Sequence, residues 1–173
     1  YNLGNALKDL GRLEDAQSSY QKAIQLKPDF AEAHNNLGVI YQENQDHEEA
    51  ERSHQKAISI NKSSASAHCN LGKALRSLGK LDEAAKTISI ALQIDRGLSE
   101  AHYNYGNTLH DQGLYREAID SYNQATALKP DYAEAYKDLS MTYLMQLDFK
   151  QGFELYEWRW KTAEFEDQFL VSD

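Results

Sequence analysis

The polar side chains with the most regular spacing are four asparagines and one aspartate, each 34 residues from the next. An asparagine side chain has an NH2 group that donates hydrogen bonds and a carbonyl oxygen that accepts them. Such a row could pair with both the C=O and the N–H of an extended peptide, whatever that peptide's side chains. The amides could instead bond neighbouring repeats to each other, or reflect simple copying of a duplicated unit. This asparagine ladder consists of Asn2, Asn36, Asn70, Asn104 and Asp138.

A second series with the same step consists of histidines, and it raises the question of a metal site. It contains His34, His68 and His102. Packed helices stand roughly 10 Å apart, whereas zinc needs its ligands within ~2.1 Å of one ion. We therefore predict that these histidines pack between helices. The single cysteine, Cys69, has no base placed beside it and is predicted to be a groove-lining or half-buried thiol, not a nucleophile.

Other catalytic signals are missing from the sequence. The glycines do not form a phosphate-binding loop after a strand, and no Ser/His/Asp set or carboxylate pair is fixed by spacing. We therefore expect this chain not to be an enzyme and to need no cofactor. A catalytic domain could still follow in a longer parent protein.

Composition narrows the class of protein further. The 173 residues have a formal net charge of −9, which argues against a nucleic-acid partner. A mean hydropathy of −0.72, with no apolar run near the ~20 residues that a membrane helix needs, argues against a membrane protein. These features favour a cytoplasmic protein. Because the chain begins with Tyr1, we expect it to be a fragment of a longer protein.

The residues that must position these side chains recur with the same 34-residue step. Glycine recurs at 4, 38, 72 and 106, and alanine recurs at 16, 50, 84 and 118. Within one period, Ala33, Leu37, Ile40 and Tyr41 follow helical spacing. Small residues allow two antiparallel helices to approach closely, so each period is predicted to be a helical hairpin. First helices are predicted near 1–10, 31–43, 65–77, 99–111 and 133–145, and second helices near 14–27, 48–60, 82–94, 116–128 and 150–162.

This pattern resembles the tetratricopeptide repeat over residues 1–162. If Ala31 is counted as position 1, large residues occupy positions 7 and 11, small residues occupy positions 8 and 20, and Tyr20, Tyr122 and Tyr156 occupy position 24. The resemblance implies an all-α, right-handed superhelical solenoid of five hairpins with a non-repeat C-terminal tail. The repeats would span 1–30, truncated at its start, then 31–64, 65–98, 99–132 and 133–162. Residues 163–173 would form the tail or a linker.

The family resemblance also implies where a partner would bind. In such arrays the first helices line a concave groove, and position 6, which the asparagine ladder occupies, points into it. The resemblance therefore implies an interaction scaffold that holds an extended peptide or a partner protein. The ladder would contact the peptide main chain, and specificity would come from Asn5, Lys73, Arg76, Tyr103 and Asn107.

Three other functions compete with this one. The ladder, with the stretch 152–160, resembles the repeat arm of O-GlcNAc transferase and bacterial arrays that precede a glycosyltransferase-like domain. An alternative function is therefore the substrate-recognition arm of a protein glycosyltransferase. A structural role is a further alternative, with homo-oligomers formed through the C-terminal cap or tail. Chaperone-tail binding is rejected, because the three basic groove residues that such clamps need are missing.

Overall fold

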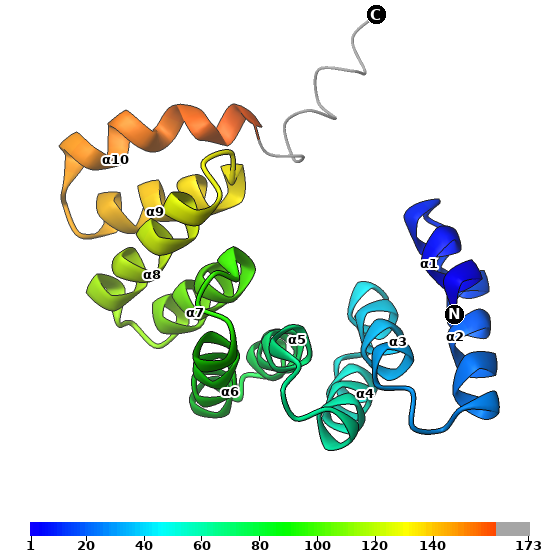
Figure 1. Ribbon diagram of the computed structural model, residues 1–173. Helices are drawn as coiled ribbons and strands as arrows, with labels where there is room; N and C mark the ends of the chain where they lie inside the picture. The colour runs from blue at the N-terminus through cyan, green and yellow to red at the C-terminus, as the bar shows by residue number, and fades with distance from the viewer. Residues whose placement is uncertain (162–173) are drawn as a thin grey trace, which may run out of the picture. The chain divides into compact units, whose positions relative to one another are not determined.

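A computed structural model of the chain describes residues 1–161, apart from the side chains of Arg159 and Lys161 (Figure 1). The tail predicted at 163–173 lies outside the described residues. The described part contains ten α-helices and one 3-10 turn, and no strand. The all-α fold predicted from the sequence is therefore confirmed. The chain divides into two compact units, residues 1–96 and residues 97 onward, at the loop between the third and fourth predicted repeats.

Unit 1 contains three helical hairpins, and unit 2 contains two. The helices of unit 1 are α1 (Asn2–Asp9), α2 (Leu13–Leu26), α3 (Ala31–Glu43), α4 (His47–Ile60), α5 (Ala65–Ser77) and α6 (Leu81–Ile94). Those of unit 2 are α7 (Ser99–Asp111), α8 (Tyr115–Leu128), α9 (Ala133–Met145) and α10 (Phe149–Tyr156), followed by the 3-10 turn η1 (Glu157–Lys161).

The helix boundaries follow the sequence pattern closely. The first helices α3, α5, α7 and α9 begin and end at the predicted residues. The second helices α2, α4, α6 and α8 begin one residue before the predicted start. The last helix is the exception, because α10 ends at Tyr156 and gives way to η1, whereas we predicted a helix over 150–162.

Close approach within each hairpin depends on the small residue at position 8. A Cβ atom added at Gly38 would lie 2.6 Å from a ring carbon of His54, which belongs to the second helix of the same repeat. Gly4 and Gly106 meet Tyr20 and Tyr122 in the same way. The last repeat has other small residues at these positions, with Ser140 at position 8 and Gly152 at position 20. The Ser140 hydroxyl donates a 2.8 Å hydrogen bond to the carbonyl oxygen of Gly152.

Apolar clusters join successive repeats inside each unit. In unit 1, Tyr20 on α2 forms a cluster with Leu37 and Ile40 on α3. In unit 2, Tyr122 on α8 forms the equivalent cluster with Leu139 on α9. The second helices α2 and α8 are thus covered by the first helix of the following repeat, and Tyr20 and Tyr122 at position 24 are buried with at most 1% exposure.

The turn inside each hairpin needs a residue with positive φ. Gly79 adopts φ = 74°, and Gly11 and Gly113 occupy the same position of their repeats with similar values. Repeats 2 and 5 place Gln45 (φ 65°) and Leu147 (φ 61°) there instead. A side chain at such φ values is strained, since its Cβ crowds the neighbouring carbonyl oxygen.

Candidate functional site

The asparagine ladder of unit 1 is built into hydrogen bonds between neighbouring repeats. The NH2 group of Asn36 donates to the Oδ1 atom of Asn5 at 3.0 Å and to the hydroxyl of Tyr1 at 3.4 Å. The hydroxyl of Tyr20, on the second helix of repeat 1, donates to the same Asn5 oxygen at 2.9 Å. One amide oxygen therefore joins the two helices of its own repeat to the first helix of the next.

Repeat 2 repeats this arrangement with different residues. The Oδ1 atom of Asn35 accepts a 3.2 Å bond from the NH2 group of Asn70 and lies 2.9 Å from Nδ1 of His54. Nε2 of the same ring lies 3.3 Å from Oε1 of Gln42, and since both oxygens can only accept, a neutral His54 ring donates to one of the two. Gln42 adds a second link to the next repeat, because its NH2 group donates to the main-chain oxygen of Asn70 at 3.3 Å.

Unit 2 keeps part of this pattern. The hydroxyl of Tyr122 donates to Oδ1 of Asn107 at 2.8 Å, as Tyr20 does to Asn5. Between its two repeats, the hydroxyl of Tyr103 donates to the carboxylate of Asp138 at 2.8 Å. The Tyr103 ring also lies 5.0 Å from the ring of Tyr132. Asp138 accepts at this junction, whereas Asn36 donates at the corresponding junction of unit 1.

These bonds, together with the burial of some side chains, limit which of the predicted site residues a ligand could contact. Asn104 and Asn107 are only 4% and 9% exposed, so the expectation that they lie open to a partner is corrected. Asn36 and Asn70 are half-buried, and their NH2 groups are already used. The alternative that the ladder bonds neighbouring repeats therefore holds for these two. The remaining predicted residues comprise Asn2 and Lys73, which are exposed, and Asn5, Arg76, Tyr103 and Asp138, which are half-buried.

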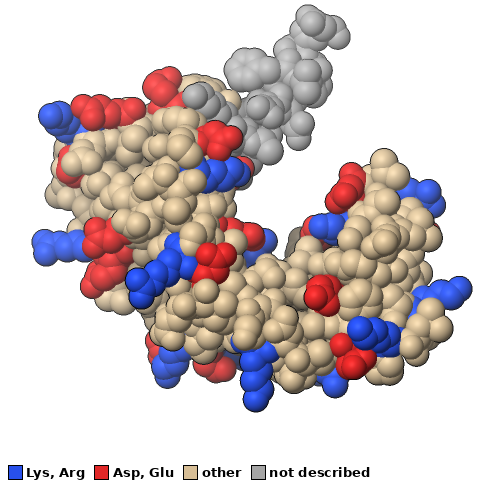
Figure 2. Space-filling model, viewed as in Figure 1, with Lys and Arg blue, Asp and Glu red and all other residues tan. Residues whose placement is uncertain are grey.

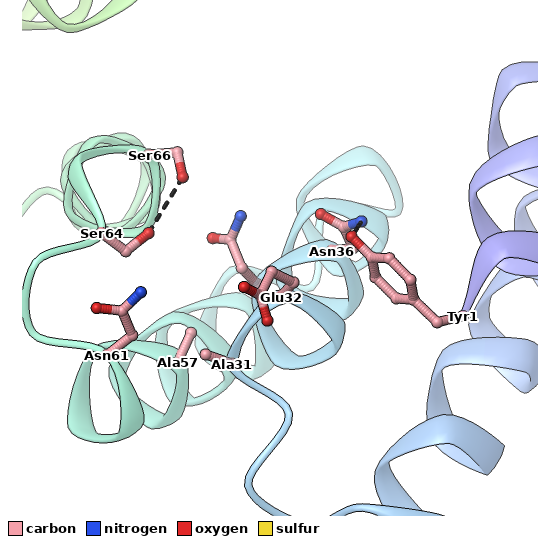
Figure 3. A pocket seen from close by; sticks show the side chains of 9 residues that line it. Tyr1, Ala31, Glu32, Asn36, Ala57, Asn61, Ser64 and Ser66 are labelled. Atoms are coloured by element: carbon pink, nitrogen blue, oxygen red, sulfur yellow. Dashed lines mark hydrogen bonds between the residues drawn. The ribbon is translucent and has the colours of Figure 1, made fainter.

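A pocket of about 240 Å³ opens beside the ladder in unit 1 (Figure 3). The start of α3 and the link from α4 to α5 form most of its wall, and Tyr1 and Asn36 close one side. Glu32 is the single charged residue of the lining and is exposed. The lining residues are Tyr1, Ala31, Glu32, Asn35, Asn36, Ala57, Asn61, Ser64 and Ser66.

The pocket offers a hydrogen-bond acceptor and a donor from adjacent residues. Oδ1 of Asn36 and the NH2 group of Asn35 make no hydrogen bond to any residue that the structure describes. Both atoms are accessible to solvent. A buried side-chain polar atom without a hydrogen-bond partner would be a different case, and among those residues the one such atom is Nδ1 of His47. The other atom of each amide is fixed by the bonds described above. The pair is therefore held in place on one side, and it leaves one acceptor and one donor for the N–H and C=O groups of a ligand.

Burial shapes the electrostatics behind the pocket. Desolvation, together with the smaller effect of the positive charge of Lys73, lowers the pKa of His54 to about 4. The ring is therefore neutral near pH 7 and bonds as a neutral group. Burial likewise raises the pKa of Tyr20, which keeps its hydroxyl protonated as a donor to Asn5.

The histidine series has a local structural role where the structure shows its bonds. Nε2 of His34 lies 3.0 Å from the main-chain oxygen of Pro28, and Nδ1 of His68 lies 2.9 Å from that of Ser64. Both histidines thus tie a first helix to the loop before it. In the described part of the chain, no group of three His, Cys, Asp or Glu residues is placed to hold a metal ion. Cys69 is 1% exposed and therefore buried, not half-buried.

Sequence reasoning did not single out Asn35 or His54, although position 24 carried a usable signal. Repeats 1 and 4 combine tyrosine at position 24 with asparagine at position 9, and repeat 2 combines histidine there with asparagine at position 5. Repeat 3 has Ile88 at position 24, with Cys69 and Lys73 in place of the amides. A polar residue at position 24 is therefore accompanied by an amide in repeats 1, 2 and 4, whereas repeat 5 combines Tyr156 with Lys137 and Met141 at positions 5 and 9.

Acidic residues outnumber basic ones in the sequence, 27 to 18. On the face shown in Figure 2, basic and acidic side chains are interspersed over each unit. Among the described residues, no helix is long and apolar enough to cross a membrane.

Comparison with protein families assigns the repeats. A family model described as TPR repeat matches residues 4–45 and 106–146, and one described as tetratricopeptide repeat matches residues 29–96. The chain therefore belongs to the tetratricopeptide repeat (TPR) family. A search of curated protein sequences gives no significant match.

Solved structures with a similar fold include several TPR proteins. The chain is 24% identical to YrrB, described as a TPR protein with an unusual peptide-binding site, with a TM-score of 0.68 over 92% of this chain and 82% of YrrB. TTC0263, a thermophilic TPR protein of Thermus thermophilus, is 20% identical, with a TM-score of 0.83 over 98% and 93% of the two chains. MamA is 20% identical, with a TM-score of 0.76 over 98% of each chain. These likenesses establish the helical-repeat fold.

Proposed function

We propose that this chain is a protein-interaction module that binds an extended peptide at the unit 1 pocket. The observation that carries the proposal is the preoriented acceptor of Asn36 beside the donor of Asn35. A peptide main chain presents an N–H that could donate to the Asn36 oxygen and a C=O that could accept from the Asn35 NH2 group. The peptide-binding site of YrrB adds support from a protein of the same fold.

The size and charge of the pocket narrow the ligand. Sites for small molecules and cofactors usually span about 300 to 1,000 Å³, so a pocket of about 240 Å³ suits one or two residues of a longer chain. Glu32 supplies the only charged side chain of the lining, so a lysine or arginine next to the bound main chain would be favoured. Most contacts are uncharged, and we expect modest affinity that gains from the fixed amides.

The test selects ligands from a random-peptide library displayed on phage and measures the enriched peptides by fluorescence anisotropy. Ser66→Trp should fill the pocket without touching the amide bonds, because the Ser66 hydroxyl bonds only that of Ser64. We expect this variant to weaken binding about tenfold or more, equivalent to about 1.4 kcal/mol. Ser63→Trp is the matched control, since Ser63 is exposed nearby and does not line the pocket.

A second variant tests the charge preference. Glu32→Gln removes only the carboxylate, so peptides with lysine or arginine should lose affinity while neutral peptides keep it. Failure to enrich any peptide above an unrelated helical protein would contradict the proposal, and so would equal affinities for wild type and Ser66→Trp.

A further inference from the structure

The buried ring of His54 belongs to a closed series of polar contacts behind the unit 1 pocket. Its Nδ1 atom lies 2.9 Å from Oδ1 of Asn35, and its Nε2 atom lies 3.3 Å from Oε1 of Gln42. Two NH2 groups complete the series, since that of Asn70 donates to Asn35 and that of Gln42 donates to the main-chain oxygen of Asn70. These contacts join α3, α4 and α5, and we call them the His54 network.

The main chain fixes the orientation of one amide in the His54 network. The main-chain oxygen of Asn70 can only accept, so the end of the Gln42 amide that faces it at 3.3 Å must be the NH2 group. The other end, Oε1, therefore faces the His54 ring. Asn35 has no main-chain partner of this kind, so its orientation depends on what the side chains of His54 and Asn70 present to it.

A neutral imidazole ring carries one hydrogen, and the position of that hydrogen decides which end of the Asn35 amide faces the pocket. With the hydrogen on Nδ1, the ring donates to Oδ1 of Asn35, and the Asn35 NH2 group is left for the pocket. With the hydrogen on Nε2, the ring donates to Gln42, and Nδ1 can only accept. The amides of Asn35 and Asn70 would then both have to turn over, and the Asn35 oxygen would face the pocket beside that of Asn36.

The distances favour the hydrogen on Nδ1. Two acceptors with no hydrogen between them repel each other, and 2.9 Å is a usual length for an N–H···O bond. The contact with Gln42 is longer, at 3.3 Å, and therefore tolerates two facing acceptors better. Burial, and to a smaller extent the positive charge of Lys73, lower the pKa of the ring, so it carries no second hydrogen near pH 7.

We infer that His54, with its hydrogen on Nδ1, is the positioning residue that makes the unit 1 pocket present a donor beside the Asn36 acceptor. The inference rests on the proposed function, because it explains how the pocket comes to offer a partner to both groups of a peptide main chain. His54 is 0% exposed and touches no ligand, so it acts only through Asn35.

Nuclear magnetic resonance on the 173-residue chain tests the hydrogen position without any ligand. At about pH 7.5, where the ring is neutral, its nitrogen chemical shifts should show a hydrogen on Nδ1 and none on Nε2. The hydrogens of the Asn35 NH2 group should exchange with water nearly as quickly as those of exposed Asn61, because they face the pocket. A hydrogen on Nε2, or a slowly exchanging Asn35 NH2 group, would overturn the inference even if peptides bind.

Two variants separate the two ring nitrogens in a binding assay. His54→Asn places an NH2 group near the position of Nδ1 and can still donate to Asn35, whereas His54→Gln reaches the position of Nε2 and donates to Gln42 instead. Peptides enriched with wild type are measured by fluorescence anisotropy. His54→Asn should bind within about twofold of wild type, and His54→Gln should bind about three- to tenfold more weakly, the effect of one lost hydrogen bond. Equal affinities of these two variants would contradict the positioning role.

The control variant is Ile58→Val, which lies on the same helix and packs against Leu71 and Leu75 outside the His54 network. It should bind peptides like wild type, and urea unfolding checks that every variant is folded under the assay conditions. Failure of the proposed function has a different signature. Ser66→Trp would then bind as tightly as wild type, while the resonance measurement would still decide the position of the His54 hydrogen.

Discussion

His54 should make the stability of unit 1 depend on pH between 6.5 and 4. Burial lowers the pKa of this ring from 6.5 to about 4, so the folded chain resists protonation while the unfolded chain accepts a proton. Above pH 6.5 both states are neutral at this site, and the ring has no effect on pH dependence. As the pH falls below 6.5, the unfolded state binds the proton first, and the folded state loses stability.

The size of the effect follows from the shift. Each pKa unit corresponds to about 1.4 kcal/mol, so the loss should be about 2 kcal/mol at pH 5 and approach about 3 kcal/mol near pH 4. A protonated ring could donate to both Asn35 and Gln42, whose oxygens lie 2.9 and 3.3 Å away. Desolvation of a charge at this 0% exposed residue outweighs that gain.

A double variant isolates the histidine. Val39→Asn with His54→Tyr recreates the pairing of Asn5 with Tyr20 and of Asn107 with Tyr122, and it removes the titrating ring. Urea unfolding at about pH 7.5 and pH 5 should show the loss of about 2 kcal/mol in wild type and in Val39→Asn alone, and its absence in the double variant. Histidine NMR titration measures the pKa of His54 directly. Equal pH dependence in all three proteins, or a His54 pKa near 6.5, would refute the reasoning.

Three further predictions test the fold. Gln45→Gly should raise the free energy of unfolding by about 1 kcal/mol by relieving the positive φ, and Gly79→Gln should lower it by a similar amount, as urea unfolding would show. Tyr122→Phe leaves the buried Asn107 oxygen without its donor and should cost about 1 to 2 kcal/mol, whereas Tyr115→Phe on the same helix should cost little. Gly72→Ala places a methyl group against the side chain of Ile88 and should lower the melting temperature, at a cost of about 1 to 3 kcal/mol; an unchanged melting temperature would mean that the hairpin can widen freely.

The repeated positions explain why so much of the fold could be predicted. Each recurring glycine or alanine marks the same helix contact in several repeats, so the ends of α3 or α9 can be predicted from any one of these repeats. The end of α10 could not be obtained this way, because its positions depart from the repeat and no following helix packs on it in the described part of the chain. Gln45 and Leu147 could have been predicted to have positive φ, since they occupy the position of Gly11, Gly79 and Gly113.

The site was only partly predictable for a different reason. The spacing placed Asn36 and Asn70 on the first helices, but spacing does not say which atom of an amide bonds to which neighbour. That depends on which position of the preceding repeat carries the acceptor amide, since Asn36 bonds to Asn5 at position 9 and Asn70 bonds to Asn35 at position 5. The role of Asn35 emerges only when the donor from His54 is placed.

The hydrogen bonds that already hold Asn35 and Asn36 affect the free energy of peptide binding. Because Asn35 and Asn36 are held by one end, their χ angles are already restricted before anything docks on the other end. Immobilising a flexible side chain at an interface costs about 0.5 to 1.5 kcal/mol, and folding has already met that cost at both residues. A peptide that binds would therefore lose its own conformational freedom, whereas the side chains of Asn35 and Asn36 would lose little more.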